Sequence, residues 1–341
     1  MVNIFIALSQ HHLNLFEKDF VKPEETTNKN ILVSSKQFVY NQDLWDEVFV
    51  STFNFHNQVN SKLERVKNII NKIKAYKALI NDIEKYRTAT EIVLYYSSLE
   101  DVLTNYMFFY FNENIKGIIV EDGVLNYYDH TLKNVSKTTT YLKKIFVILF
   151  GLKYKNYKGH TTGIDYDKCL YQYVRMPSYA IRPEKSKTLK FNLRTFENIS
   201  EEILIIGQEP YANLIGPREF ETQLIRLYEN ILNSESYAKA KIIYYKPHRN
   251  GPRIDYDFLQ TFFKDKKVEV IDSNDSVENI FFNEVRCKYL FTFDSSAVVN
   301  ISAEADIALK NKIEITTMPI LINDLSDLFS KLNFKILDDD L

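Results

Sequence analysis

At residues 241–250 the chain reads KIIYYKPHRN, a short apolar strand that runs directly into a charged turn. Open α/β sheets bind their ligands outside the carboxyl ends of the strands, which is where this turn lies. Lys246, His248 and Arg249 stand within four residues of one another, and Pro247 stiffens the bend between them. Such a cluster suits a phosphate or a phosphodiester, although an ordinary basic surface turn has the same composition.

Strands and helices alternate on both sides of this turn. Apolar runs at residues 203–206, 268–271 and 289–293 are separated by segments with helical spacing. The first half has further strand-like runs, at 2–8, 31–35, 48–53, 92–96 and 117–120. This order of short apolar strands and helices is typical of parallel, doubly wound sheets, so we predict an α/β fold.

The length of the chain predicts two domains. With 341 residues it exceeds the size at which one hydrophobic core usually stops growing. Regular apolar patterns weaken from about residue 153 to 190, where Lys, Tyr, Gly, Thr and Pro are frequent and only residues 169–174 resemble a strand. We therefore expect an N-terminal domain over residues 1–155, a linker region over 156–190 and a C-terminal domain over 191–341.

Charge and targeting signals restrict the class of protein. The 43 basic and 45 acidic side chains leave a formal net charge of -2, which argues against a general nucleic-acid binder. Residues 1–8 are apolar but lack the basic start and the cleavage site of a signal peptide, and no apolar run is long enough to span a bilayer. The two cysteines give no disulfide framework, so we expect a cytoplasmic protein.

Residues 62–87 are the most helical stretch of the chain, with apolar side chains at three- and four-residue spacing. They carry eight basic and three acidic side chains. A basic amphipathic helix of this kind can contact the anionic inner face of the cell membrane, or it can be an ordinary surface helix. Both interpretations fit the pattern.

Two further turns follow predicted strands. Glu121, Asp122 and Gly123 come after the run 117–120. A carboxylate there has the position and the chemistry of a general base, although acidic-glycine turns are also common on surfaces. Ser295 and Ser296 follow the run 289–293 and open a helix, where the exposed amides and the helix dipole favour an anion; a plain N-cap explains the pair equally well.

Several familiar sites are missing from the sequence. It contains no GxGxxG after the first strand, no GxxxxGK[ST] loop and no HExxH. The adjacent residues His11 and His12 follow the first strand, but neighbours on a helix cannot share a face, so they make a poor metal pair. We expect a polar turn at this position.

The acidic-acidic-Gly turn, the Lys-Pro-His turn and the Ser-Ser pair occur in an order that resembles the bacterial sialyltransferases of GT-B architecture. The closest resemblance is to glycosyltransferase family 52, the lipooligosaccharide and capsule sialyltransferases. Ser9-Gln10 after the opening strand and Gly207-Gln208 after the run 203–206 are also similar to that family. The resemblance covers essentially the whole chain and implies two Rossmann-like, doubly wound domains that face a cleft.

The resemblance implies a role for each motif. Glu121 would be the general base that takes the proton of the acceptor hydroxyl, with Asp122 as the alternative. His248 would bind the phosphate of CMP-sialic acid and assist its departure, Ser295 and Ser296 would hold phosphate oxygens, and Glu278 would bind the cytidine ribose. The remaining residues on the donor side would be Gly207, Gln208, Lys246, Pro247 and Arg249. The family usually has Pro after the histidine, so Arg249 is a departure that puts the pose of His248 in question.

These roles imply an inverting transfer of sialic acid to a terminal galactoside or sialoside of a surface glycan. CMP carries one phosphate, so a histidine and two hydroxyls can replace a metal ion, and we expect no metal or other cofactor. The resemblance also makes a homodimer reasonable. Two other readings stay open: a GT-B glycosyltransferase with another nucleotide sugar, and a non-catalytic peripheral membrane protein that works through residues 62–87.

Overall fold

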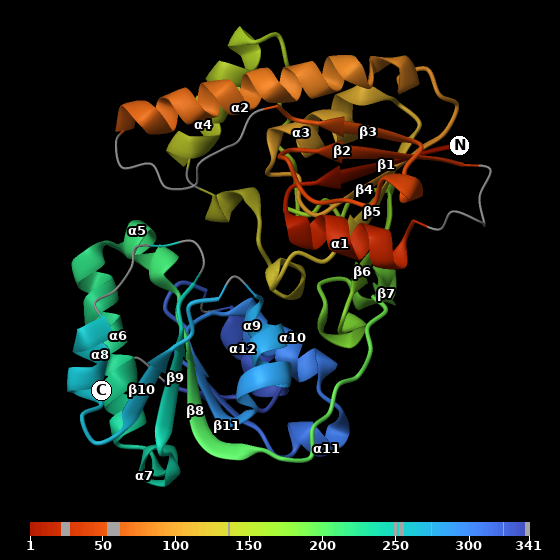
Figure 1. The fold of residues 1–341 in the computed structure, drawn as a ribbon. Helices are drawn as coiled ribbons and strands as arrows, with labels where there is room; N and C mark the ends of the chain where they lie inside the picture. The colour runs from red at the N-terminus through yellow and green to blue at the C-terminus, as the bar shows by residue number, and fades with distance from the viewer. Residues whose placement is uncertain are drawn as a thin grey trace. The chain divides into compact units, whose positions relative to one another are not determined.

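The computed structural model describes residues 1–21, 28–52, 62–135, 137–248, 251, 256–273, 275–322 and 324–337. The chain forms two compact units, Met1–Lys190 and Phe191–Leu341. Each unit is built on its own sheet, and each is described separately below (Figure 1).

The first unit contains a seven-stranded parallel sheet in the order β3-β2-β1-β4-β5-β6-β7. Its central strands, such as those that begin at Val2 and Ile92, are continuous apolar runs because helices cover both faces, as the sequence predicts. The strands are β1 (Val2–Ala7), β2 (Lys29–Ser34), β3 (Glu47–Val50), β4 (Ile92–Tyr96), β5 (Ile115–Val120), β6 (Cys169–Val174) and β7 (Ser186–Thr188).

Residues 156–190 are not a linker. β6 and β7 lie in this stretch and extend the first sheet beyond β5, so the first unit continues to Lys190. The reason lies in the burial of β6, where buried and partly exposed positions alternate. Its sequence looks strand-like but lacks the continuous apolar run of β1 or β4, so the pattern does not show that β6 belongs to the first sheet.

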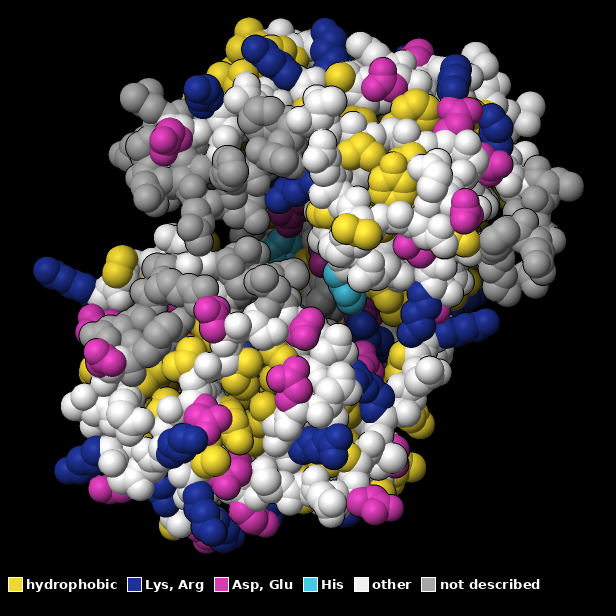
Figure 2. All heavy atoms as spheres, viewed as in Figure 1, with side chains coloured by type: hydrophobic (Ala, Val, Ile, Leu, Met, Phe, Trp, Pro, Cys, Tyr) yellow, Lys and Arg dark blue, Asp and Glu magenta, His cyan; other side chains and the backbone are white. Residues whose placement is uncertain are grey.

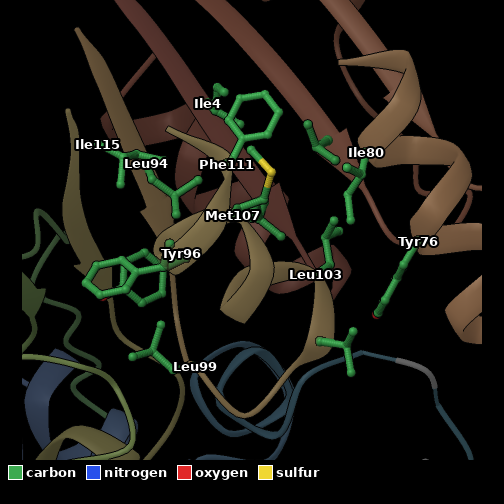
Figure 3. Close-up of a cluster of buried hydrophobic side chains, with 14 of the residues drawn as sticks. Ile4, Tyr76, Ile80, Leu94, Tyr96, Leu99, Leu103, Met107, Phe111 and Ile115 are labelled. Atoms are coloured by element: carbon green, nitrogen blue, oxygen red, sulfur yellow. The ribbon is translucent and has the colours of Figure 1, made fainter. Parts of the chain in front are cut away.

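Alternate residues of β1 face two different cores. Ile4 and Ile6 point into a cluster formed with helices α2 (Lys62–Asp82) and α3 (Val102–Tyr106), and Figure 3 shows Tyr76 and Leu103 on those helices. Phe5 and Ala7 instead pack with helix α1 (Gln10–Asp19) on the other face. The remaining helical segments of this unit are α4 (Lys137–Leu149), a π-helical turn (Met107–Phe111) and short 3-10 turns (Gln42–Leu44, Glu84–Tyr86, Leu125–Tyr127, Leu132–Asn134, Pro177–Tyr179, Pro183–Lys185).

The apolar side of α2 is not available to a membrane. Ile73, Tyr76, Leu79 and Ile80 are all at most 2% exposed, because they form one wall of the first core. Lys67, Lys74 and Lys77 of α2 are exposed, as on an ordinary surface helix. Within the described residues, no helix is long and apolar enough to cross a membrane.

The second unit contains a six-stranded parallel sheet in the order β10-β9-β8-β11-β12-β13. Figure 1 shows α6 and α8 on one side of this sheet and α9, α10 and α12 on the other. The strands are β8 (Ser200–Ile206), β9 (Ile242–Lys246), β10 (Lys267–Val270), β11 (Cys287–Thr292), β12 (Glu314–Thr317) and β13 (Lys335–Ile336). The helices are α5 (Ala212–Ile215), α6 (Pro217–Leu232), α7 (Glu235–Lys239), α8 (Tyr256–Phe262), α9 (Val277–Ile280), α10 (Ser296–Glu304), α11 (Ile307–Lys310) and α12 (Leu325–Lys331), with single turns at Glu209–Tyr211 and Phe281–Val285.

Both sheets have the strand order of a Rossmann domain. Counted from its own first strand, each runs 3-2-1-4-5-6, and the first sheet adds β7 at its edge. The chain direction across the sheet therefore reverses between β1 and β4 in the first unit and between β8 and β11 in the second. Ligands of such sheets bind outside the carboxyl ends of the strands at this switch point.

Candidate functional site

Three of the sequence motifs meet at the switch point of the second unit. β8 lies between β9 and β11, so Gly207, His248 and Ser295 follow neighbouring parallel strands (Figure 1). The strand ends are joined by hydrogen bonds: the amide of Gly207 donates to the carbonyl of Lys246 at 2.9 Å, and the Thr292 hydroxyl donates to the carbonyl of Ile206 at 3.0 Å. The sequence motifs therefore share one edge of one sheet.

Glu209 organises the turn that carries His248. Its carboxylate is buried, accepts the backbone N–H of His248 at 2.8 Å and accepts the Tyr245 hydroxyl at 2.5 Å. A carboxylate with two such donors fixes the exit of the chain from β9. His248 is half-buried at that exit. The sequence analysis does not single out Glu209, because nothing in the local pattern shows that its side chain folds back toward β9.

Gly207 is required beside this carboxylate. A Cβ atom at residue 207 would lie 2.6 Å from Oε1 of Glu209 and 2.7 Å from the Tyr245 hydroxyl oxygen. The Glu209 carboxylate and the Tyr245 hydroxyl cannot readily move aside, because they are hydrogen-bonded to each other. Gly207 therefore serves the site by leaving room for Glu209, and Gln208 beside it is buried.

The serine pair begins helix α10. Ser295 is buried and is the N-cap, with its hydroxyl accepting the amide of Ala297 at 3.3 Å. Ser296 is the first helical residue and is half-buried. The helix is nine residues long, so its dipole and first amides favour an anion next to these hydroxyls.

Glu278 lies on the neighbouring helix α9 and contacts α10. Its Oε1 accepts a hydrogen bond from Nδ2 of Asn300 at 2.6 Å, and Asn300 is buried. This contact holds the half-buried Glu278 carboxylate close to the helix that Ser295 caps. Asn300 is a further residue of the region that the sequence analysis does not identify.

Lys246 does not have the position expected of a phosphate ligand. It is 4% exposed, and its ammonium donates to the carbonyl of Ser273 at 2.7 Å and to that of Pro247 at 3.2 Å. Its charge therefore ties the turn after β9 to the segment after β10. Pro247 is buried beside it, and Arg249 lies outside the described residues.

The acidic turn of the first unit separates its two carboxylates. Glu121 is 0% exposed and forms an ion pair with the guanidinium of Arg175; its other oxygen accepts the amide of Arg175 at 2.6 Å and the Tyr127 hydroxyl at 2.5 Å. These contacts account for both oxygens of the carboxylate. Glu121 is thus buried and fully paired in this structure, whereas the resemblance gives it the role of general base with Asp122 as the alternative.

Asp122 points the other way. Its side chain is 48% exposed, and its Oδ1 lies 3.3 Å from Nε2 of His12. Burial raises the pKa of Asp122, but the contact with His12 and the nearby positive charge of His12 and His11 outweigh this effect, so the pKa lies below its ordinary value. Gly123 allows the turn because its φ is +59°.

His12 reaches Asp122 from the first turn of α1. The Ser9 hydroxyl caps this helix by accepting the amide of His12 at 3.2 Å, and His12 is 3% exposed. β1 and β5 both deliver their carboxyl ends to this edge, on either side of β4. The sequence suggests only a polar turn here; the partner of His12 is more than a hundred positions away along the chain.

Asp122 lines a pocket of about 560 Å³ at the switch point of the first unit. The pocket also has Ser97 and Ser98 from the end of β4, and His130, whose Nδ1 lies 3.4 Å from Oε1 of Glu100. Its opposite wall comes from α2, where the Lys72 ammonium lies 2.8 Å from the Asp101 carboxylate. Leu8, Ile73 and Val102 are among the apolar side chains that line the rest of the pocket. A mostly apolar pocket with a few polar groups is typical of sites for small ligands.

Among the described residues, no group of three or more His, Cys, Asp or Glu side chains is placed to hold a metal ion.

Comparison with solved structures identifies the fold. An α/β-galactoside α-2,3-sialyltransferase from Photobacterium phosphoreum matches with a TM-score of 0.52 and 11% identity, over 100% of this chain and 98% of that one. The fold is of the GT-B type. Two other GT-B structures match with TM-scores of 0.50: a sialyltransferase from Photobacterium damselae (11% identity, 98% and 99% coverage) and a glycosyltransferase from Streptomyces nogalater (8% identity, 99% and 87% coverage).

No protein-family model matches the chain, and no curated protein matches it by sequence. Membership of glycosyltransferase family 52 is therefore not established by these comparisons. What they establish is the architecture: two Rossmann-like domains, as in GT-B glycosyltransferases.

Proposed function

We propose that this chain is a glycosyltransferase that transfers sialic acid from CMP-sialic acid to a hydroxyl of a glycan, with inversion at the anomeric carbon. The observation that carries the proposal is the placement of His248, Ser295 and Ser296 at the ends of neighbouring strands, at the switch point of the second unit. The presence of sialyltransferases among proteins of similar fold supports it.

The donor would bind to the second unit. His248, the two serine hydroxyls and the first amides of α10 form a phosphate site without Lys246, whose ammonium is bound to carbonyls. A set of this size suits the single phosphate of CMP better than a diphosphate. Glu278, held by Asn300, would accept the hydroxyls of the ribose. Of the residues named on the donor side, Gly207, Gln208, Lys246 and Pro247 would act by shaping the turn, and Arg249 remains a candidate for the phosphate.

The acceptor would bind to the first unit, in the pocket that Asp122 lines. The carboxylates, the serines and His130 can hydrogen-bond the hydroxyls of a galactoside or a sialoside. Asp122 is the carboxylate that an acceptor can reach, whereas Glu121 is buried against Arg175. We therefore assign the general base to Asp122, with His12 as the residue that positions it and keeps it ionised.

The chemistry balances without a further reactant. Asp122 takes the proton of the acceptor hydroxyl while the oxygen of that hydroxyl attacks the anomeric carbon of sialic acid. The bond between that carbon and the phosphate oxygen breaks, and CMP leaves with the electron pair. His248, the serine hydroxyls and the helix amides stabilise the charge that grows on the phosphate. Attack opposite to the leaving group gives inversion.

Nucleotide binding tests the donor assignment. Isothermal titration should show that CMP binds more tightly than UDP, and that His248→Ala and Ser296→Ala each weaken CMP binding by about tenfold or more, since each removes a hydrogen bond to a charged group. Ser330→Ala, an exposed serine on α12, is the matched control and should bind CMP as the wild type does. Tighter binding of UDP would instead indicate a different nucleotide sugar, and no binding of either would contradict an enzyme of this class.

A further inference from the structure

Helix α4 presents a row of apolar side chains to solvent. Tyr141, Ile148 and Leu149 are 65%, 70% and 71% exposed, and Leu142 and Ile145 are exposed by about a third. These positions recur at three- and four-residue spacing, so they share one side of the helix. The opposite side is occupied by Val147, which is 0% exposed and belongs to the first core. α4 therefore buries one apolar side in the protein and leaves a second one uncovered.

Only basic side chains accompany this row. Residues 131–158 contain seven lysines and no aspartate or glutamate. The neighbouring helix α2 adds two exposed lysines: the ammonium of Lys74 lies 5.7 Å from the centre of the Phe150 ring, and that of Lys77 lies beside Gly151. Figure 2 shows hydrophobic and basic side chains side by side over the upper end of α4. The surface combines apolar area with charge of one sign.

A shallow apolar pocket opens at the start of the row. It has a volume of about 370 Å³ and is lined by Leu132, Val135 and Tyr141, with Lys133 and Lys144 among the remaining residues. Apolar walls beside two ammonium groups suit a hydrocarbon chain that ends in a phosphate. The pocket and the helix row belong to one continuous surface, because Tyr141 contributes to both.

We propose that α4 is a membrane-docking surface for bilayers that contain anionic phospholipids. Tyr141, Ile145, Ile148 and Leu149 enter the boundary between headgroups and acyl chains. Lys144 and the exposed Lys133 and Lys153 contact lipid phosphates. An amphipathic helix with an uncovered apolar side and a lysine-rich surround binds such interfaces. In α2, for which the sequence leaves a membrane contact open, Ile73, Tyr76 and Ile80 are instead buried in the first core.

Charge argues against a second copy of the chain as the occupant. A symmetric dimer through α4 would bring two lysine-rich segments against each other, with no acidic residue in either to compensate. An anionic bilayer supplies the missing negative charge. The inference is independent of the donor and of the reaction proposed above.

Vesicle co-sedimentation tests the inference with the full chain. The wild type should bind vesicles of phosphatidylcholine mixed with phosphatidylglycerol, and bind vesicles of pure phosphatidylcholine far less. The double variant Ile148→Asn/Leu149→Asn should bind the mixed vesicles about tenfold or more weakly, because two apolar side chains no longer enter the bilayer. Lys144→Gln/Lys153→Gln should also bind more weakly and should lose most of the salt dependence.

Matched variants separate docking from general effects. Leu214→Asn/Ile307→Asn replaces two side chains that are 69% and 78% exposed in the second unit, and Lys310→Gln/Lys335→Gln replaces two exposed lysines there. Both controls should sediment with mixed vesicles as the wild type does, and all four variants should melt at the wild-type temperature. Equal binding to both kinds of vesicle, or equal loss in the controls, would overturn the inference. A different result would also overturn it: the wild type is a dimer in sedimentation velocity, Ile148→Asn/Leu149→Asn is a monomer, and neither binds vesicles.

Discussion

Oδ1 of Asp122 lies 3.3 Å from Nε2 of His12, a residue more than a hundred positions earlier in the chain. The adjacent carboxylate of Glu121 points into the protein and pairs with Arg175. Two neighbouring acids therefore have different surroundings: one is enclosed by donors, and the other lines a pocket next to a histidine. We therefore expect Glu121 to stabilise the fold and Asp122 to take part in the reaction, and each expectation can be tested.

Replacing Glu121 should reduce stability. In Glu121→Gln the guanidinium of Arg175 loses its buried counter-charge, so the free energy of unfolding should fall by about 3–5 kcal/mol. Urea unfolding followed by circular dichroism measures this. Glu91→Gln is the control, because Glu91 pairs with Lys116 at 2.9 Å on an exposed surface and should have little effect. Equal stability of Glu121→Gln and the wild type would show that the ion pair is not structural.

Removing His12 should change the pH profile of the reaction. The contact with His12 lowers the pKa of Asp122, so in His12→Asn that pKa should rise and Asp122 should become protonated at a higher pH. The acidic limb of kcat/KM should then move to higher pH, with activity recovering as the pH rises. His11→Asn should move the limb in the same direction by less, because the influence of His11 is smaller. An unmoved acidic limb in His12→Asn would mean that Asp122 does not titrate in the reaction.

A methyl group at residue 207 should disturb the donor side. In Gly207→Ala the new Cβ meets the carboxylate of Glu209 at 2.6 Å, so the carboxylate must move away from the amide of His248. We expect a loss of about 1–3 kcal/mol in stability and a higher KM for the donor. Gly216→Ala is the comparison, because Gly216 has φ +99° and no atom within 4 Å of the added Cβ. It should lose stability through backbone strain while its donor KM stays unchanged; a similar rise in KM in both variants would count against a specific role for Glu209.

Chelation should leave the reaction unaffected. The proposed phosphate ligands are a histidine, two hydroxyls and backbone amides, which neutralise a single phosphate without a cation. Product formation should be the same in an excess of chelator as in its absence. Loss of activity that a divalent ion restores would show that the donor binds through a metal.

The sequence predicts well where the Gly207, His248 and Ser295 turns lie in the second sheet, because the strands before them are continuous apolar runs. β8, β9 and β11 each end within one residue of the end of an apolar run, so the turns after them could be placed at one edge of a parallel sheet. β6 looks strand-like in the sequence, but neither β6 nor β7 could be assigned to the first sheet in this way. They lie toward the edge of the first sheet, and alternating burial removes the continuous apolar signal.

The directions of individual side chains could not be predicted from the motifs. Adjacent residues at a strand end point to different sides, and the choice between Glu121 and Asp122 depends on Arg175, which is 54 positions away. Lys246 likewise bonds to a carbonyl 27 positions away, so the composition of the turn does not show that this lysine faces away from a ligand. The apolar spacing of α2 and α4 shows that each helix is amphipathic. It does not show which of their apolar side chains are buried in the core and which stay exposed.

The central claim is that Asp122 removes the proton of the acceptor when sialic acid leaves CMP. The most direct measurement is CMP release from CMP-sialic acid, with and without lactose, for the wild type, Asp122→Asn, Glu121→Gln and His248→Ala. Lactose should accelerate CMP release by the wild type. In Asp122→Asn the lactose-dependent rate of CMP release should be about a hundredfold or more lower, while the variant still binds CMP. His248→Ala should release CMP slowly under both conditions, and Glu121→Gln should keep the acceleration at temperatures where it is folded. Full acceleration in Asp122→Asn, with its loss in folded Glu121→Gln, would contradict the account.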